Sequence, residues 1–156
     1  MIMKVVFLDI DGVLNSYQYL SRTSMEDAGI YDELDPQKVD LLQKLVVQTG
    51  ASIVLSSSWR ESFENMMPLD YVARSLLAVL KEHSLSIYGM TPLLKGQRDG
   101  EIRQWLACHS EVDSFVVLDD EHYNWKELEA HWVKTSYYVG LTEQNLQQAV
   151  DILNRK

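Results

Sequence analysis

The chain has 156 residues, of which 46% are hydrophobic and 24% are charged, and its formal net charge is −9. This length and composition are typical of one globular domain that is large enough to bury a core. The negative charge argues against a protein that holds nucleic acid on an extended basic surface. The negative charge does not exclude a protein that binds only the end of a nucleic acid in a metal-bearing cleft. The one cysteine, Cys108, has no partner for an internal disulfide.

The hydropathy pattern also bears on localisation and on domain organisation. No apolar run approaches the ~20 residues that a membrane-spanning helix requires, and no charged-then-apolar leader precedes the first apolar stretch. We therefore expect a cytoplasmic protein without a membrane partner. No internal repeat, low-complexity tract or linker interrupts the chain, so residues 1–156 are predicted to form a single domain.

The first element is an apolar stretch at residues 5–8, continued by Ile10, which predicts a short strand buried on both faces. Two carboxylates, Asp9 and Asp11, come where this strand should end, and Gly12 follows at once. A buried carboxylate without a partner is costly or loses its ionisation, and a bound divalent cation is the simplest compensation. The same residues are also compatible with a strand that ends in the Asp-Gly turn of a β-hairpin. This stretch alone does not separate the two interpretations.

A loop and a helix are predicted next. Residues 16–34 are polar and aperiodic and predict a loop or flap with room for a short helix. Asp35-Pro36 is a typical helix start, with Asp as the N-cap and Pro at the first helical position. Apolar residues then recur at helical spacing until Gly50, so the pattern predicts an amphipathic helix over residues 36–48.

A second apolar strand is predicted at residues 51–55, and it ends in the serines 56–58. A strand, a helix and a strand at this spacing form a βαβ unit, whose strands are parallel. Both strands then end at the same edge of the sheet. We therefore expect Asp9 and Asp11 to lie beside Ser56.

The second half of the chain continues the same alternation of helices and strands. Its predicted elements are two helical pieces within residues 61–83 broken near Pro68, a connection at 84–100, a helix at 101–108, a strand at 115–118, a strand at 133–139 and a last helix that begins after Thr142. The whole pattern predicts an α/β fold with three layers, α/β/α, and a mainly parallel, Rossmann-like sheet.

Polar residues gather where the predicted strands end. Asp119 and Asp120 follow the strand at 115–118, and two cations, Lys95 and Arg98, precede a helix. Ligands of open α/β sheets lie beyond the carboxyl ends of the strands. Four carboxylates at one edge would repel one another, and Mg²⁺ with its preference for oxygen ligands relieves this. A metal, a hydroxyl donor, a fixed cation and a nucleophilic carboxylate together favour phosphoryl transfer.

In this order, the polar segments resemble the four motifs of the haloacid dehalogenase (HAD) superfamily of phosphatases. The segments are Asp9-Ile10-Asp11-Gly12-Val13, Ser56, Lys95 or Arg98, and Asp119-Asp120. More narrowly, residues 55–60, Thr91-Pro92, residues 98–106 and residues 118–120 resemble a small subgroup associated with RNA repair. That subgroup is similar to the 3′-phosphatase half of polynucleotide kinase-phosphatases.

The resemblance implies two catalytic residues. Asp9 would be the nucleophile, forming an aspartyl-phosphate, and also a metal ligand. Asp11 would protonate the leaving oxygen and later activate water, while its backbone carbonyl touches the metal. Because Asp11 is present, the resemblance favours hydrolysis of phosphomonoesters.

The resemblance also implies binding roles. The phosphoryl group would be held by Ser56, with Ser57 or Ser58 as alternatives. Its charge would be neutralised by Arg98 or Lys95, and the Arg-x-x-Glu spacing favours Arg98. The remaining metal ligands would be Asp120, directly, and Asp119, beside it or through water.

These roles imply a Mg²⁺-dependent phosphatase. No long insertion follows the first motif or lies between the second and the third, so we expect a minimal cap or none, a form that the resemblance links with extended substrates. The first substrate expectation is a nucleotide or a nucleic-acid end such as a 3′-phosphate. A small-metabolite phosphatase is the first alternative, favoured by the acidic composition and the lack of basic patches. A non-catalytic phosphate-binding or partner-binding module is the second, and the Asp9 and Asp11 pair argues against it.

Overall fold

The computed structural model describes residues 2–23 and 34–155. Their centre is a parallel sheet with the strand order β5-β2-β1-β6-β7. The strands are β1 (Met3–Leu8), β2 (Ser52–Leu55), β5 (Ile87–Met90), β6 (Val112–Asp119) and β7 (Trp132–Lys134). Because every pairing in this sheet is parallel, the carboxyl ends of all its strands meet at one edge.

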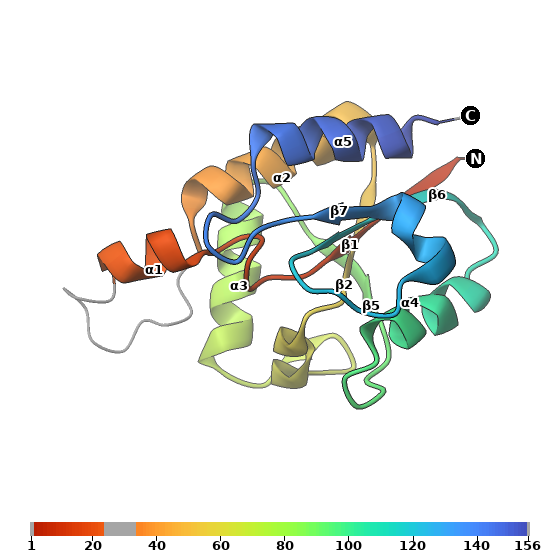
Figure 1. Ribbon diagram of the computed structural model, residues 1–156. Helices are drawn as coiled ribbons and strands as arrows, with labels where there is room; N and C mark the ends of the chain where they lie inside the picture. The colour runs from red at the N-terminus through yellow and green to blue at the C-terminus, as the bar shows by residue number, and fades with distance from the viewer. Residues whose placement is uncertain (1, 24–33, 156) are drawn as a thin grey trace.

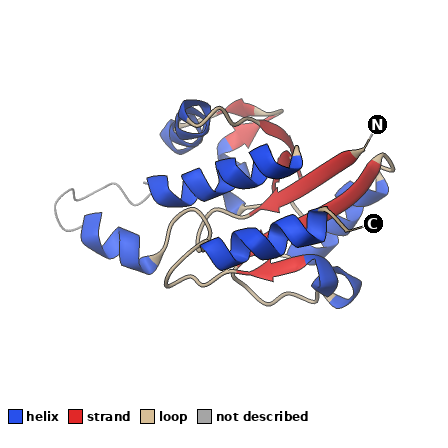
Figure 2. Cartoon of the chain, turned by 90° about the horizontal axis from the view of Figure 1, so that it is seen from above, coloured by secondary structure: helices blue, strands red, loops and turns tan. Residues whose placement is uncertain are grey.

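Helices cover both faces of the sheet. One face packs against α2 (Pro36–Thr49), α3 (Tyr71–Glu82) and α5 (Glu143–Leu153). The other face packs against α4 (Arg98–Ala107) and the short 3-10 helix η2 (Lys126–His131). Figure 1 shows α2 and α5 on one side of the sheet and α4 on the other, and Figure 2 shows α2 and α5 lying along the strands. The predicted three-layer α/β/α architecture is confirmed.

Strand β1 lies at the middle of the sheet and is buried on both faces. Its side chains alternate, so that Val6 and Leu8 join the core under α2, α3 and α5 while Val5 and Phe7 join the core under α4. All four are fully buried. A central parallel strand packs against a helical layer on each side, so these four side chains are all apolar. The predicted burial of this strand on both faces is confirmed.

The helix start and stop signals near α2 are correct. The Asp35 carboxylate accepts a hydrogen bond from the Gln37 backbone N–H at 3.0 Å, and Pro36 is the first helical residue. Gly50 has a φ of +72° and its N–H donates to the carbonyl of Val46 at 2.8 Å. The predicted helix at residues 36–48 is therefore real and ends within one residue of its expected position.

The first helical piece predicted within residues 61–83 is wrong. The chain there forms a 3-10 helix, η1 (Ser58–Ser62), and then a hairpin of β3 (Phe63–Glu64) and β4 (Met67–Pro68) before α3 begins. The two turn residues, Asn65 and Met66, both have positive φ, which is the backbone of a tight hairpin turn. Asn adopts positive φ more readily than most residues, but Met rarely does. The sequence therefore gives little indication of a turn at this position.

Two further strands differ from the sequence-based expectation. Strand β5 lies inside the stretch predicted as a connection, and it is an edge strand that contains Gly89. Strand β7 ends at Lys134, because residues 135–140 turn back in a segment closed by a bridge between Ser136 and Gly140. The short helix for which the predicted flap has room is present as α1 (Tyr17–Thr23), and residues 24–33 lie outside the described part of the chain.

None of the helices in the described part of the chain combines the length and the apolar character that crossing a membrane would need.

Candidate active site

Three carboxylates converge at the carboxyl edge of the sheet. Asp9 directly follows β1, Asp119 ends the neighbouring strand β6, and Asp120 comes next. The register pairs Leu8 with Leu118, and the Asp9 N–H donates to the Leu118 carbonyl at 3.0 Å, which brings the strand ends level. One oxygen of each carboxylate lies within 4.8 Å of the others. This group, Asp9, Asp119 and Asp120, is called the carboxylate cluster below.

Burial controls the protonation of the carboxylate cluster. Burial, and then the nearby charge of Asp119, raises the pKa of Asp9 well above its usual value, while Arg98 opposes the shift. Burial likewise raises the pKa of Asp119 to about 6 against the opposing charge of Arg98. The pKa of the half-buried Asp120 is also raised, again mainly by burial. The three ionised carboxylates therefore need positive charge beyond that of Arg98, and a hard divalent cation with oxygen ligands supplies it.

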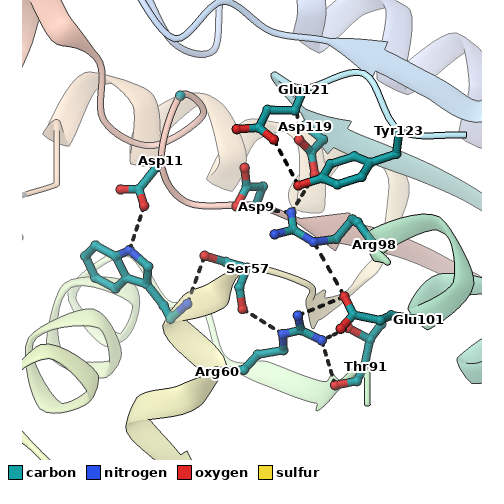
Figure 3. Close-up of polar contacts among 12 residues, drawn as sticks. Asp9, Asp11, Ser57, Arg60, Thr91, Arg98, Glu101, Asp119, Glu121 and Tyr123 are labelled. Carbon is teal, nitrogen blue, oxygen red and sulfur yellow. Dashed lines mark hydrogen bonds and ion pairs between the residues drawn. The ribbon is translucent and has the colours of Figure 1, made fainter. Parts of the chain in front are cut away.

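Arg98 is the cation of this cluster. It opens α4, and its Nη1 donates to Asp119 Oδ2 at 2.7 Å and lies 3.5 Å from Asp9 Oδ1. Its guanidinium carbon is 5.4 Å from the centre of the Tyr123 ring, which covers it (Figure 3). Lys95, the other predicted cation, is exposed on a turn with a φ of +49°. Among the described residues its ammonium group has no recorded hydrogen bond or ion pair, so the geometry favours Arg98.

The serine that follows β2 has an unused buried hydroxyl. Ser56 is fully buried, and its N–H donates to the Leu8 carbonyl at 2.9 Å, which fixes it beside the end of β1. Within the described part of the chain its Oγ has no hydrogen-bond partner. Leaving a buried polar group without a partner costs about 1–3 kcal/mol, so such a group is a candidate contact for a ligand oxygen.

The second serine has a structural contact. The Ser57 hydroxyl accepts a hydrogen bond from the Trp59 N–H at 3.1 Å and caps η1, and the Ser57 carbonyl accepts one from Arg60 Nε at 2.6 Å. Ser58, the third serine, is exposed. Of the predicted serines, Ser56 is therefore the one whose buried hydroxyl has no partner among the residues that the structure describes.

Beneath the cluster lies a buried ion pair that the sequence pattern does not reveal. Arg60 Nη2 donates to Glu101 Oε1 at 3.0 Å, and both side chains are almost completely buried. Arg60 Nη1 also donates to the carbonyls of Thr91 and Pro92, each at 2.9 Å. The charged partner of Arg60 is Glu101, 41 residues away along the chain (Figure 3).

Asp11 stands apart from the carboxylate cluster. Its side chain is exposed, and Figure 3 shows it on the opposite side of Asp9 from Arg98. Asn15 Nδ2 donates to one of its oxygens at 3.0 Å and Trp59 Nε1 to the other at 3.2 Å. Neither contact with Asp11 was predicted from the sequence. Asn15 follows Asp11 by four residues and is a typical local partner, whereas nothing local marks Trp59.

The backbone conformation and the surroundings of residue 12 require the glycine that follows the two aspartates. Gly12 has a φ of +81°, and a Cβ at this position would overlap the carboxylate of Asp120. Its N–H donates to Asn15 Oδ1 at 3.1 Å and its carbonyl accepts from Thr135 Oγ1 at 2.6 Å. The Asp-Gly hairpin is therefore the wrong alternative: β1 pairs in parallel with β2 and β6, and the glycine lets the chain pass beside Asp120.

Residues 5–146 match the model of a family described as the HAD domain in Swiss Army Knife RNA repair proteins. The chain belongs to this family. Comparisons with curated proteins and with solved structures returned no match. The match extends from β1 into α5 and includes all the predicted site residues. The family suggests a HAD-type, phosphatase-like function, and HAD domains typically use Mg²⁺.

The residues of this HAD domain fit such an ion. The carboxylate cluster offers three oxygen ligands in a partly dry setting, and the raised pKa values show that the protein alone does not compensate their charge. Gly12 leaves room for Asp120 at this edge. Because carboxylates with water and phosphate oxygens are the usual ligands of Mg²⁺, this donor set suits it.

We expect the stability of the metal-free HAD domain to fall as the pH rises through the range of the raised carboxyl groups. The pKa of Asp119 is about 6 in the folded protein and 3.8 in its ordinary environment. Between these values the folded state binds more protons than the unfolded state, so the free energy of unfolding decreases with increasing pH. A shift of this size corresponds to about 3 kcal/mol. Urea unfolding at a series of pH values, in wild type and in Asp119→Asn, isolates this contribution as the difference between the two proteins.

Mg²⁺ should reverse the loss where the carboxylates are ionised. At saturating Mg²⁺ and neutral pH we expect about 3 kcal/mol of stabilisation, which raises the Tm of a domain of this size by roughly 6–12 °C. Below pH 4 the effect should vanish. Asp120→Asn is the matched variant and should lose most of the Mg²⁺ response. A wild type whose Tm is indifferent to Mg²⁺ at neutral pH would contradict metal binding at the cluster.

Proposed function

We propose that this domain is a Mg²⁺-dependent phosphomonoester hydrolase that acts through an aspartyl-phosphate on Asp9. The observation that carries this proposal is the position of Asp9, a buried carboxylate between the cation Arg98 and the end of β2, where the Ser56 hydroxyl has no hydrogen-bond partner among residues 2–23 and 34–155. A phosphoryl group at this place would meet a nucleophile, a fixed cation and a hydroxyl donor together. A site that only bound phosphate would gain nothing from a buried carboxylate, which repels an anion.

The first half of the reaction transfers the phosphoryl group to the protein. An oxygen of Asp9 attacks phosphorus, and the bond from phosphorus to the leaving oxygen breaks. Asp11, as a carboxylic acid, gives its proton to that oxygen, so that the product leaves as a neutral alcohol. Ser56 and Arg98 hold the oxygens of the transferring group.

The second half restores the protein. The Asp11 carboxylate takes a proton from a water molecule, whose oxygen attacks phosphorus. The bond from phosphorus to Asp9 breaks, and inorganic phosphate and the free Asp9 carboxylate result. Asp9, Asp119, Asp120 and the backbone carbonyl of Asp11 would hold Mg²⁺. When bound, the ion supplies positive charge that balances the phosphoryl oxygens.

We further propose that the substrate is a phosphorylated nucleic-acid end, with a 3′-phosphate as the first expectation. The support is the family description, which names RNA repair proteins, and the modest size of what surrounds the site. Among the described residues, the additions to the sheet and its covering helices are α1, η1 and the β3–β4 hairpin rather than a separate cap domain. A small-metabolite phosphatase is the second candidate, favoured by the net charge of −9.

A substrate panel tests both candidates. Phosphate release with Mg²⁺ is measured from single-stranded oligonucleotides that carry a 3′-phosphate or a 5′-phosphate, from nucleoside monophosphates and from sugar phosphates. We expect kcat/KM to be highest for the 3′-phosphorylated oligonucleotides. Hydrolysis of metabolites without hydrolysis of oligonucleotides would select the second candidate. No hydrolysis of any monoester would reject the phosphatase proposal.

A further inference from the structure

The carboxylate of Asp11 is held between two neutral hydrogen-bond donors. Trp59 Nε1 lies 3.2 Å from Oδ2 and Asn15 Nδ2 lies 3.0 Å from Oδ1, so each oxygen has one donor from the protein. Asp11 is otherwise exposed, and an exposed aspartate side chain that is not held turns freely about its two side-chain torsions. The two donors therefore select one orientation of this carboxyl group.

Trp59 is well placed to fix that orientation because it is itself immobilised. The residue is 8% exposed, and from η1 it joins the core under α2, α3 and α5. The Ser57 hydroxyl caps its backbone N–H, and the next residue, Arg60, is anchored by Glu101 and by the Thr91 and Pro92 carbonyls. The direction of the indole N–H thus follows from a rigid turn and not from a surface rotamer.

Asn15 completes the arrangement from the other side. It is fully buried, and its Oδ1 accepts the Gly12 N–H at 3.1 Å while its Nδ2 donates to Asp11. The amide of Asn15 thereby ties the orientation of Asp11 to the backbone turn that carries it. No charged donor contacts Asp11 in the described residues, so both contacts orient the group without pairing its charge.

We propose that Trp59, with Asn15, is a positioning residue that holds the Asp11 carboxyl group for proton transfer to the leaving oxygen. The proposal rests on the proposed function, in which Asp11 is the acid. In this role Trp59 contacts Asp11 and neither the phosphoryl group nor the carboxylate cluster. Trp59 affects the rate only by orienting Asp11. Its replacement should therefore change the kinetics in a way that differs from the replacement of a residue that only supports the fold.

The expected kinetic effect of misplacing Asp11 is a loss of rate that depends on the leaving group of the substrate. When the leaving oxygen belongs to an alkyl group, the bond to phosphorus breaks efficiently only if the oxygen receives a proton, so misplacing Asp11 slows the step. When the leaving group is para-nitrophenolate, the negative charge is stabilised by the ring and the proton is largely dispensable. A general loss of folded protein lowers both rates by the same factor and leaves their ratio unchanged.

The test compares kcat/KM of wild type and Trp59→Phe for para-nitrophenyl phosphate and for β-glycerophosphate, with Mg²⁺ throughout. The phenylalanine keeps most of the apolar surface and removes the N–H. We expect kcat/KM for the alkyl ester to fall by about 10- to 100-fold and that for the aryl ester to fall by less than about threefold. Trp105→Phe is the matched control, because Trp105 is a similarly buried tryptophan in the core under α4; its ratio of the two rates should equal that of wild type.

Asn15→Asp provides an independent variant in case Trp59→Phe does not fold. It keeps the acceptor for the Gly12 N–H and replaces the donor to Asp11 by a like charge, so the same selective loss on the alkyl ester is expected. If either folded variant loses both activities by the same factor, or loses neither, the positioning role is rejected while the proposed function stands. If wild type does not hydrolyse β-glycerophosphate, a 3′-phosphorylated oligonucleotide takes its place as the alkyl ester. A wild type that hydrolyses no monoester of the panel rejects the proposed function, and the positioning role falls with it.

Discussion

Replacing Asp9 by Asn is expected to lower kcat for phosphomonoester hydrolysis by at least about 10⁴-fold, the scale of losing a covalent nucleophile. The amide has nearly the shape of the carboxylate but cannot form the aspartyl-phosphate. Arg98 keeps its hydrogen bond to Asp119 at 2.7 Å, so the site should otherwise hold together. The measurement is the steady-state rate with a saturating aryl monoester and Mg²⁺.

The same substitution should make the metal-free protein more stable. Burial and the charge of Asp119 raise the pKa of Asp9, so the folded metal-free protein disfavours the ionised form of this group. The neutral amide cannot ionise and removes this cost, so we expect the Tm of the metal-free protein to rise. A loss of activity together with a gain of stability is the pattern of a residue retained for chemistry.

Asp151→Asn is the control for this pair of effects. Asp151 is exposed on α5, where it accepts a hydrogen bond from Gln147, and its replacement should leave both rate and Tm close to those of wild type. If Asp9→Asn keeps more than about a tenth of the wild-type kcat, Asp9 is not the nucleophile. A decrease in the metal-free Tm would show that the Asp9 charge stabilises the fold.

The parts of the fold that sequence reasoning predicted correctly are those with local causes. The α2 helix has its start in Asp35 and its stop in Gly50, and β1 and β2 are short apolar runs. Parallel pairing of β1 with β2 then follows from the length of the connection. Because parallel strands end at one edge, the convergence of Asp9 with the residues after β6 could be anticipated from the sequence.

What could not be anticipated depends on contacts between distant segments. Arg60 and Glu101 are separated by 41 residues and lie on η1 and α4, and no periodicity in either segment marks the other. The hydrogen bond from Trp59 to Asp11 spans 48 residues. The sequence favoured Arg98 over Lys95 only by its spacing to Glu101, whereas the contact that sets Arg98 apart joins it to Asp119, 21 residues away.

Glu101→Gln is expected to lower the free energy of unfolding by about 3–5 kcal/mol, the usual cost of removing one partner of a buried ion pair. Glu101 Oε1 accepts from Arg60 at 3.0 Å and lies 3.7 Å from Arg98 Nε, while Oε2 accepts from the Leu94 N–H at 2.7 Å. A glutamine amide cannot serve all these donors, because its own NH₂ group must face one of them. The buried Arg60 then loses its counter-charge. Urea unfolding with Mg²⁺ present measures the effect.

Lys44→Gln is the matched control, because it removes an ion pair of similar chemistry from the surface. Lys44 lies 3.5 Å from Glu143, and both side chains are more than half exposed, so its loss should cost less than about 1 kcal/mol. Glu101→Gln should also reduce kcat/KM, because Glu101 steadies both Arg98 at the carboxylate cluster and the η1 turn that carries Trp59. If Glu101→Gln were as mild as Lys44→Gln, the buried pair would be dispensable and η1 would have to be held in place by its backbone contacts alone. Such an outcome would show that the rigidity of the η1 turn does not depend on the ion pair between Arg60 and Glu101.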